Sequence, residues 1–430
     1  MAGLKVLIIG GGGREHAIAW KCANDAGVAQ VYCAPGNAGT ANETGVSNLD
    51  ISVEDISGLV AFAQNNAIDL TIVGPEAPLV AGIVDRFQAA NLPCFGPTQR
   101  AAILEGSKSF TKDFLKRHQI PTAAYATFED LDGALAYIDD LNDPPVVKAD
   151  GLAAGKGVVV ALDHDMAKEA VRDMLGEGKF GSAGARVVIE ERLIGEEASF
   201  IVMAEGEDAV PLASSQDHKA RDEGDRGPNT GGMGAYSPAP VVNEEMVGRV
   251  MREVIMPTLK GMAAEDRRFS GFLYAGLMIS PEGIPKVLEF NCRCGDPETQ
   301  PILARLQSEL SATCLAVMDG QAGSLQLQWD PRPALGVVMA AGGYPGSYAS
   351  GDVIEGLEPA SGDTHVFHAG TQLVDGQVVT SGGRVLCVVG LGDSVSDAQG
   401  RAYERVARIA WQNAYYREDI GYRAIARERD

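Results

Sequence analysis

Residues 286–300 read KVLEFNCRCGDPETQ, and this stretch constrains the fold and the chemistry of the chain more than any other. Its first half has the composition of a β-strand, in which side chains alternate between the two faces of a sheet. Glu289, Asn291 and Arg293 would then share one face, with Val287 extending that face on its apolar side. Cys292 would pack on the opposite face.

A carboxylate, an amide oxygen and a guanidinium in one row suit a hard cation such as Mg²⁺ bound together with phosphate oxygens. The alternative is that Glu289 and Arg293 form only a salt bridge on the surface of a sheet. The turn that follows, with Asp296 and Glu298, adds carboxylates that would hold a substrate ammonium.

Two other apolar strands accompany this one, EASFIVMA at 197–204 and GFLYAGLMI at 271–279. Between them lies a polar, glycine-rich segment at 214–238. Because strand patterns dominate from residue 195 to about residue 320, we expect a mixed, mainly antiparallel sheet here.

Upstream, residues 107–193 predict a small α+β lobe with helices at 107–118 and 165–177 and strands on either side of a glycine loop. The loop, GLAAGKG at 151–157, differs from a P-loop because only three residues separate Gly151 from Gly155 and Gly157 replaces Ser or Thr. Since it lies between two strands, we interpret it as a β-hairpin lid whose amides close over the terminal phosphates of ATP.

Lys148 lies on the apolar strand that leads into this loop, where a partly buried ammonium needs an anion. It would point at the α- and β-phosphates, unless it is a lysine whose ammonium reaches the surface. After the strand at 185–193, the backbone around Glu190 would hydrogen-bond an adenine edge, Leu193 would pack on the ring, and Glu197 would hold ribose hydroxyls. The alternative for this acidic run is a solvated surface.

The N-terminal region alternates strands at 4–9, 30–34, 69–74 and 93–96 with helices at 55–66 and 78–91, which predicts a doubly wound parallel sheet. Gly10 to Gly13 follow the first strand and open a helix, a geometry that presents backbone N–H groups to an anion. Glu15 or His16 stands where a dinucleotide-binding fingerprint has its third glycine.

Arg14, directly after these glycines, offers a bidentate ligand for phosphate. We therefore interpret the loop as a phosphate site for a small molecule. A plain strand–helix turn is the alternative.

The last hundred residues predict strands at 335–341, 364–369 and 383–390, followed by a helix from Ser394 to about Asn413. The fold class is thus a multidomain combination of α/β and α+β units. We place the domain boundaries at 1–105, 106–328 and 329–430, with a lid lobe at about 122–192 within the second domain.

Composition restricts the function further. The 430 residues carry a net charge of −22, so the surface repels phosphate backbones and anionic lipid, and we expect neither nucleic-acid nor membrane binding. Seven scattered cysteines fit reduced thiols, and Cys292 and Cys294 lack the second pair that a zinc site needs. The short apolar run at the N-terminus reads as a buried strand and not as a signal peptide, so we expect a cytoplasmic protein.

Taken together, two spaced lysines, a glycine hairpin lid, an acidic adenine hinge and a strand E-x-N-x-R resemble the ATP-grasp superfamily. The chain is similar to its phosphoribosylamine–glycine ligase family over nearly its whole length. The stretches that carry the resemblance are GGREHA (12–17), APGNAGT (34–40), VGPEAPL (73–79), EGSKSFTKDF (105–114), KADGLAAGKGV (148–158), EEASFIVM (196–203), SQDHK (215–219), GPNTGGMGAYSPAP (227–240), EFNCRCGDPETQ (289–300), GVVMAAGGYPG (336–346), FHAGT (367–371) and GGRVLCV (382–388).

The resemblance implies ATP-dependent amide formation between glycine and 5-phosphoribosylamine through a glycyl phosphate, with Mg²⁺ or Mn²⁺, in purine biosynthesis. It also implies a monomer that binds only small molecules. The resemblance implies ATP contacts for Lys108, Lys148, Gly155, Lys156, Glu190, Leu193 and Glu197. Glu289 and Asn291 would bind the metal, and Arg293 and Lys148 would be catalytic. The remaining roles fall to Gly12, Gly13, Arg14, Asn37 and Glu76 for the phosphoribosyl group and to Asp217, Lys219 and Asp296 for glycine and the reacting amine.

Two positions depart from the family pattern. Cys294 stands where the family usually has an aromatic residue, and residues 220–223 differ from the usual run after the His–Lys pair. Neither departure removes a proposed ligand.

Three other functions are weighed against this one. A ligase that uses bicarbonate or formate is disfavoured by the SQDHK and NTGGMGAYSP segments, and a NAD-dependent dehydrogenase by the missing third glycine. A silent nucleotide-binding regulator is disfavoured because its chain would not need a complete set of catalytic side chains. That set consists of Lys108, Lys148, Glu289, Asn291 and Arg293.

Overall fold

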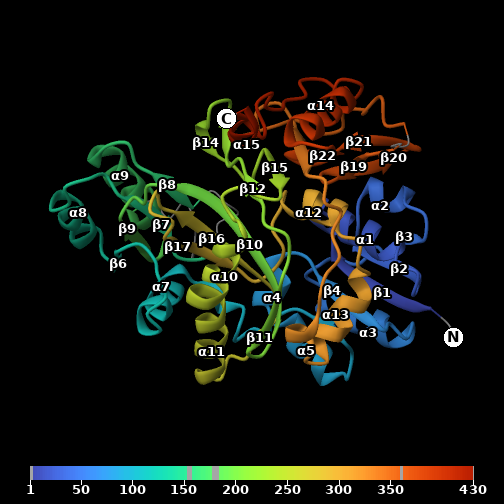
Figure 1. Cartoon of the computed structure of the whole chain (residues 1–430), viewed down its shortest axis with the longest axis horizontal. Coiled ribbons are helices and arrows are strands. Elements are labelled where there is room, and N and C mark those ends of the chain that lie inside the picture. The colour runs from blue at the N-terminus through green and yellow to red at the C-terminus, as the bar shows by residue number, and fades with distance from the viewer. Residues whose placement is uncertain (1–2, 153–156, 177–183, 359–361, 430) are drawn as a thin grey trace.

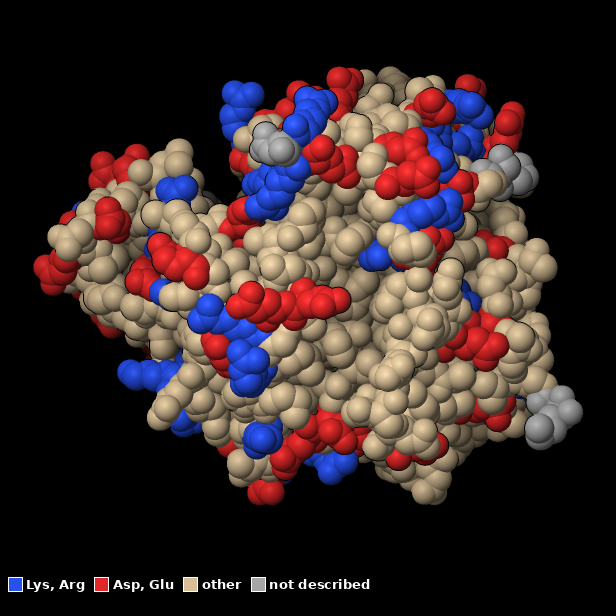
Figure 2. Space-filling view, viewed as in Figure 1, with Lys and Arg blue, Asp and Glu red and all other residues tan. Residues whose placement is uncertain are grey.

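The computed structural model describes residues 3–152, 157–176, 184–358 and 362–429 (Figure 1). Within this part of the chain, none of the helices combines the length and apolar composition needed to cross a membrane. Acidic and basic side chains are interspersed on the face shown in Figure 2. All seven cysteines are buried free thiols.

The N-terminal domain is built on a parallel sheet of five strands in the order β3-β2-β1-β4-β5, which confirms the predicted doubly wound sheet. Winding reverses between β1 and β4, so the loops that follow these two strands open a crevice at one edge of the sheet. The elements are β1 (Leu4–Gly10), α1 (Gly13–Ala23), β2 (Val28–Pro35), α2 (Ala38–Asn42), β3 (Val46–Asn48), α3 (Ile56–Asn65), β4 (Leu70–Val73), α4 (Glu76–Val80), α5 (Ile83–Ala89) and β5 (Cys94–Phe95).

The single helix expected at 78–91 is wrong, because two short helices, α4 and α5, replace it. Gly82 lies between them with φ +86°, a left-handed conformation that interrupts a helix and that glycine tolerates best. The first helix begins earlier than expected, at Glu76. This places the Glu76 carboxylate in the crevice directly after β4.

The next lobe has a four-stranded antiparallel sheet in the order β6-β9-β7-β8, as the α+β prediction required. It has its own small core, in which Ile138 and Val171 of the helices pack on Val147 and Ile189 of the sheet. The elements are α6 (Ile103–Gly106), α7 (Lys108–Arg117), β6 (Tyr125–Phe128), α8 (Leu131–Asp139), β7 (Val146–Ala149), β8 (Val158–Val160), α9 (His164–Val171), a π-helical turn (Arg172–Gly176) and β9 (Val187–Glu190).

A second antiparallel sheet, β11-β10-β16-β17, faces this lobe across the cavity described below (Figure 1). Its Phe200, Leu273 and Phe290 share one core with Phe87 of the N-terminal domain. The elements are β10 (Glu196–Glu205), β11 (Asp208–Pro211), α10 (Glu244–Val250), a π-helical turn (Met251–Ile255), α11 (Met256–Ala264), β16 (Ser270–Ile279), β17 (Pro285–Asn291), α12 (Thr299–Arg305), α13 (Leu310–Met318) and a 3₁₀ turn (Ala322–Ser324).

Strand β17 contains a β-bulge that the sequence pattern does not predict. Gly276 pairs with Glu289 while the next residue, Leu277, pairs with Val287, so Leu288 is an extra residue. The bulge reverses the alternation of side chains, and Val287 therefore packs in the core with Phe290 and Cys292. The expectation that Val287 extends the face of Glu289 is wrong, whereas the packing of Cys292 on the other face is confirmed.

The C-terminal sheet has the order β12-β15-β18-β22-β19. Two of its strands, β12 and β15, come from the glycine-rich segment at 214–238, so this segment joins the C-terminal sheet across the predicted boundary at 328. The elements are β12 (Gln216–Asp217), β13 (Ala220–Asp222), β14 (Arg226–Asn229), β15 (Gly234–Ser237), β18 (Ala334–Ala340), β19 (Thr364–His368), β20 (Thr371–Val374), β21 (Gln377–Thr380), β22 (Arg384–Leu391), α14 (Val395–Val406) and α15 (Tyr422–Arg429).

The helix expected from Ser394 to about Asn413 ends earlier, at Val406. Ala410 instead forms an isolated bridge with Glu355, and Asn413 has φ +58°. Both backbone arrangements are incompatible with a continuing helix, so Ile409 reaches the core from an irregular segment.

Candidate active site

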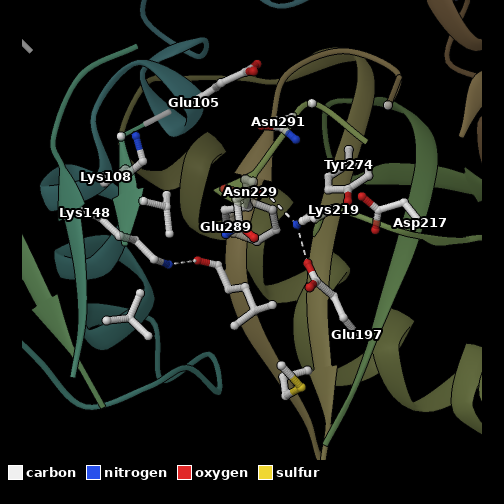
Figure 3. Close-up of a pocket in the computed structure, with 18 of the residues that line it drawn as sticks. Glu105, Lys108, Lys148, Glu197, Asp217, Lys219, Asn229, Tyr274, Glu289 and Asn291 are labelled. Atoms are coloured by element: carbon white, nitrogen blue, oxygen red, sulfur yellow. Dashed lines mark hydrogen bonds and ion pairs between the residues drawn. The ribbon is translucent and has the colours of Figure 1, made fainter. Parts of the chain in front are cut away.

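A cavity of about 770 Å³ lies where the two antiparallel sheets, the crevice of the N-terminal domain and two residues of the C-terminal sheet, Asp217 and Arg384, meet. Figure 3 shows how charged side chains from separate elements point into it. Of the predicted site residues, the cavity is lined by Arg14, Glu76, Lys108, Lys148, Glu190, Leu193, Glu197, Asp217, Lys219, Glu289, Asn291, Arg293 and Asp296.

One side of the cavity is an apolar slot. Val146, Val158 and Leu193 line it from the lid lobe, and Met278 and Leu288 line it from the facing sheet. The bulge in β17 is what brings Leu288 to this side. An apolar slot of this kind suits a purine ring.

Beside the slot, two lysines share one buried carboxylate. Glu190 lies 2.8 Å from Lys112 Nζ and 2.9 Å from Lys148 Nζ, and Lys148 also donates to the carbonyl oxygen of Leu288 at 3.0 Å. The Glu190 side chain therefore holds two lysines and does not itself point to a ligand. Burial lowers the pKa of Lys112 to about 8, although the Glu190 charge opposes this shift.

Lys108 is a cation that fits a phosphate. Its Nζ donates to the carbonyl oxygen of Gly151 at 3.0 Å, and no carboxylate of the described residues lies within salt-bridge distance of it. Burial lowers its pKa, a shift that the Glu289 charge opposes and the Lys148 charge reinforces. A bound polyphosphate would supply the counter-charge that this arrangement lacks.

Glu289 stays ionised at the centre of these cations. Lys219 Nζ lies 3.6 Å from Glu289 Oε1 and also pairs with Glu197 (Figure 3). Burial alone would raise the pKa of Glu289, but the charges of Lys219, Lys148 and Lys108 outweigh it and lower the pKa to about 2. An ionised, buried carboxylate beside an amide oxygen is a suitable pair of ligands for a hard divalent cation.

Asn291 and Arg293 are both oriented by Glu105, a residue the sequence interpretation did not select. Glu105 accepts a hydrogen bond from the Cys292 N–H at 2.7 Å and forms an ion pair with Arg293 Nη2 at 2.9 Å. The Asn291 amide satisfies its partners when its nitrogen donates to Glu105 Oε1 at 3.1 Å and to the carbonyl oxygen of Phe290 at 3.2 Å. Its oxygen then points away from Glu105 and is available to a cation.

Arg293 is the cation at the N-terminal end of the cavity. Its Nε lies 3.4 Å from Glu76 Oε2, and its Nη2 binds Glu105. Burial would lower the pKa of Arg293, but these two carboxylates raise it above its usual value. Burial would raise the pKa of Glu76, which the charges of Arg293 and Arg14 lower instead.

The glycine run lies behind the cavity wall and does not line it. The Gly12 N–H donates to Glu15 Oε2 at 2.6 Å, and Gly13 packs against Gln300. Of this loop only Arg14 reaches the cavity, where its Nη1 donates to the carbonyl oxygen of Cys294 at 3.1 Å.

Asn37 also lies outside the cavity lining. Its side chain accepts from the N–H groups of Gly39 and Thr40 and donates to the carbonyl oxygens of Gly11 and His368. The side chain therefore caps α2 and ties the glycine loop to the C-terminal sheet. Gly12, Gly13 and Asn37 are thus not brought to the cavity, because the Gly12 N–H is bound to the Glu15 carboxylate and the Asn37 amide to backbone groups.

The lid prediction concerns two further residues, Gly155 and Lys156, which lie outside the described residues. The flanking strands β7 and β8 pair in antiparallel register, as the hairpin interpretation requires.

The opposite end of the cavity is acidic. Burial raises the pKa of Asp217, which the Lys219 charge opposes and the Glu298 charge reinforces. Glu298 accepts a hydrogen bond from Ser199 Oγ at 2.9 Å, and Ser199 in turn contacts the hydroxyl of Tyr274 at 2.9 Å. Carboxylates held in this way are suited to bind an ammonium group or to accept its proton.

One arginine comes from the C-terminal sheet. Arg384, at the start of β22, lies 2.9 Å from Asp296 Oδ2 and donates to the carbonyl oxygens of Asp296 and Gly231. Gln300 holds the other oxygen of Asp296 at 2.8 Å. Sequence interpretation did not select Arg384, although it lies in the GGRVLCV stretch, because its partner Asp296 is 88 residues away in the sequence. Lys112, in contrast, was detectable because it lies one helical turn after Lys108 on α7.

The fold and the site together define an ATP-grasp enzyme with an N-terminal and a C-terminal domain around its nucleotide cavity. Residues 106–299 match the model of the family described as phosphoribosylglycinamide synthetase, ATP-grasp (A) domain. Residues 4–105 and 334–423 match the N domain and the C domain of the same synthetase.

The chain belongs to the phosphoribosylamine–glycine ligase family. It is 63% identical over 427 residues to the phosphoribosylamine–glycine ligase of Allochromatium vinosum, covering 99% of this chain and 100% of that one. It is 62% identical to the Pseudomonas aeruginosa enzyme, with 99% of each chain covered. The crystal structure of the Thermotoga maritima phosphoribosylamine–glycine ligase superposes with a TM-score of 0.83 at 33% identity, covering 97% of this chain and 100% of that one.

More distant structures share the fold alone. The biotin carboxylase of Campylobacter jejuni, solved as a complex with β,γ-ATP, superposes with a TM-score of 0.74 at 13% identity. It covers 96% of this chain and 92% of its own.

Proposed function

We propose that the chain joins glycine to 5-phosphoribosylamine at the expense of ATP, giving glycinamide ribonucleotide, ADP and phosphate. A single observation carries the proposal. One cavity brings together an apolar slot, a cluster of lysines around an ionised Glu289, and acidic groups at the far end that suit an amine. Membership of the ligase family selects the substrates among those that such a site accepts.

ATP fits the slot and the cations next to it. The adenine would lie between Leu193 and Met278, and Glu197 would hold the ribose. Lys108 and Lys148 would contact the phosphates. Lys112 would act indirectly, by sharing Glu190 with Lys148.

Glu289 and Asn291 would hold the divalent cation. When bound, Mg²⁺ or Mn²⁺ neutralises phosphate charge and aligns the γ-phosphate for transfer. The two ligands supply only one negative charge, so phosphate oxygens and water would complete the coordination. Among the described residues no cluster of three or more His, Cys, Asp or Glu side chains offers a more complete metal site.

The reaction needs an activation step because a carboxylate is a poor electrophile. The glycine carboxylate attacks the γ-phosphate and forms glycyl phosphate, while Arg293 stabilises the charge that develops on the transferring group. The amine of phosphoribosylamine then attacks the acyl carbon and phosphate leaves. The lost proton would pass to the acidic end of the cavity, where Asp217 and Glu298 are candidates to accept it.

The anionic phosphoribosyl group needs cations at the N-terminal end. Arg14 and Arg384 are the arginines that reach this region from outside the central domain. Among the described residues each of them forms an ion pair with a single carboxylate, Arg14 with Glu15 and Arg384 with Asp296. A cytoplasmic, monomeric enzyme that binds neither nucleic acid nor membrane remains our prediction.

Substrate dependence tests the proposed function. ADP release from ATP is expected only when glycine and phosphoribosylamine are both present, because the acyl phosphate is consumed only by the amine. Coupled measurement of ADP with each substrate omitted in turn checks this. Equal release with bicarbonate in place of glycine, or none with glycine, would refute the proposal.

Replacing Arg384 by methionine is expected to raise the KM for phosphoribosylamine by about ten- to a hundredfold, since hydrogen bonds to charged groups contribute about 1.5–3 kcal/mol. The KM for ATP is expected to stay unchanged. Arg384→Lys is the matched variant, because it keeps the charge and loses the planar fork. An unchanged KM for phosphoribosylamine in both variants would remove Arg384 from the acceptor site.

A further inference from the structure

The hairpin β13–β14 links two groups of residues that line the cavity. Lys219 lies immediately before it, and Asn229, Thr230 and Gly231 lie at its end. Its two ends are tied together, because the N–H and the hydroxyl of Thr230 both donate to the carbonyl oxygen of Lys219, at 2.7 and 2.9 Å. The position of this hairpin therefore constrains the backbone of Lys219, from which the side chain extends to Glu197 and Glu289.

The hairpin forms a two-stranded sheet of its own. The hairpin packs on the C-terminal segment 415–423, which leads into α15. Figure 1 shows β14 beside α15 at the top of the molecule. The Gly224 N–H donates to Asp419 Oδ2 at 2.8 Å, and the hydroxyl of Tyr415 donates to the carbonyl oxygen of Arg221 at 3.0 Å.

Asp225, at the tip of the hairpin, makes three further contacts with this segment. It accepts hydrogen bonds from Arg417 Nη1 at 2.9 Å and from the hydroxyl of Tyr422 at 2.6 Å, and it also pairs with Arg423. The Arg417 side chain is fully buried, and its Nη1 also donates to the carbonyl oxygen of Ala220 at 3.0 Å. A buried guanidinium needs such partners, so the tip of the hairpin and the C-terminal segment hold each other in place.

His218 makes a second connection, from the other face of the segment that carries Lys219. The Gly421 N–H donates to His218 Nε2 at 3.0 Å, so this nitrogen carries no hydrogen and Nδ1 is the donor, with Asp225 Oδ1 at 3.5 Å. Burial lowers the pKa of His218, which keeps the ring neutral. Its sequence neighbours, Asp217 and Lys219, both line the cavity.

We propose that the C-terminal segment 415–423 positions the substrate-binding segment 217–231, with His218, Asp225 and Arg417 as positioning residues of the ligase. None of these three lines the cavity, and each acts by fixing where Asp217 and Lys219 lie. The expected change in the KM for glycine rests on the proposed function. The expected displacement of segment 217–231 rests on geometry alone.

Asp225→Asn is the variant that tests whether segment 415–423 positions segment 217–231. Asp225 has φ +56°, and asparagine tolerates this left-handed conformation best among residues with a side chain, so the backbone of the tip is retained. The substitution removes the negative charge that faces Arg417 and Arg423. The KM for glycine is expected to rise about tenfold, because charge-assisted hydrogen bonds that fix Lys219 are weakened, while the KM for ATP changes little.

Asp363→Asn is the matched control. Asp363 also accepts from two arginines, Arg332 and Arg401, on the same domain, but within the described part of the chain it does not contact the hairpin. A loss of stability without displacement of the hairpin would affect the two variants alike, whereas positioning predicts a KM change in Asp225→Asn alone. Equal KM values for glycine in the two variants would overturn the proposal.

Hydrogen–deuterium exchange of residues 217–231 gives a readout that does not depend on activity. Faster exchange in Asp225→Asn than in the wild type and in Asp363→Asn is expected, and unchanged exchange would overturn the proposal. If the wild-type enzyme fails to use glycine, the proposed function falls while this measurement still decides the positioning. Should Asp225→Asn not fold, Tyr422→Phe removes a single hydroxyl contact to Asp225, and the same two readouts then apply.

Discussion

Replacing Arg293 by methionine is expected to lower kcat by about 10³-fold or more, the range seen when an arginine that stabilises a transferring phosphoryl group is removed. Arg293 is the guanidinium nearest to the metal ligands on the strand segment that follows β17, and Glu105 fixes its direction by a 2.9 Å contact. Methionine keeps most of the length of the side chain and removes the charge. Single-turnover measurement of ADP formation with saturating ATP and glycine isolates the affected step.

Two variants control this result. Arg293→Lys keeps a charge but loses the planar fork and is expected to fall between methionine and the wild type. Arg268→Met removes an exposed arginine that pairs with Glu205 away from the cavity and is expected to have wild-type kcat. The melting temperature must be followed as well, because Glu76 and Glu105 lose their shared cation. Near wild-type kcat in a folded Arg293→Met protein would exclude the assigned role.

The second large effect is expected for Glu289→Gln. The variant keeps the shape of the side chain and removes the only carboxylate assigned to the metal, so kcat/KM is expected to fall about 100-fold or more at a fixed Mg²⁺ concentration. Half-activation should also need more metal. Titration of activity with Mg²⁺ and with Mn²⁺ separates a weakened metal site from a lost catalytic step.

Glu289→Gln is expected to fold normally, because the neighbouring Lys219 keeps its pairing with Glu197. Glu282→Gln, in the exposed turn before β17, is the matched control and is expected to show the wild-type metal titration. Wild-type turnover of Glu289→Gln at low Mg²⁺ would refute the metal site.

The low pKa of Glu289 determines the pH range over which this carboxylate carries the charge that would bind the metal. A carboxylate whose pKa is lowered to about 2 stays ionised from neutral pH down to well below the ordinary glutamate value of about 4.3. Its charge, and the stability that the charge contributes beside three lysines, is therefore lost only as the pH falls through about 2.

Much of the molecule was predictable because local patterns determined it. Alternating strands and helices gave the parallel sheet, and the strand pattern around Glu289 and Asn291 gave a row of side chains that does face the cavity. Period-two alternation failed at Leu288, because a bulge depends on how two strands pair and not on either strand alone. The same reasoning misplaced Val287.

Other parts of the site could not be predicted from the sequence, for a different reason. Glu105 and Arg384 act through partners that are far away in the sequence, and no local spacing marks such contacts. Asn37 was selected for its place in a glycine-rich motif, but the structure uses it as a helix cap. The same asparagine side chain can bind a substrate or cap a helix, so only the fold distinguishes these two roles.

The strands β12 and β15 belong to the C-terminal sheet although the chain reaches them more than ninety residues before β18. The order of segments along the chain therefore does not coincide with their grouping into sheets. A fragment ending near residue 328 would expose the edge of β15 that normally pairs with β18, and an unpaired edge of this kind invites association with other chains. The enzyme is consequently not modular in the sense that its domain order suggests, and separate expression or exchange of residues 329–430 would interrupt a continuous sheet.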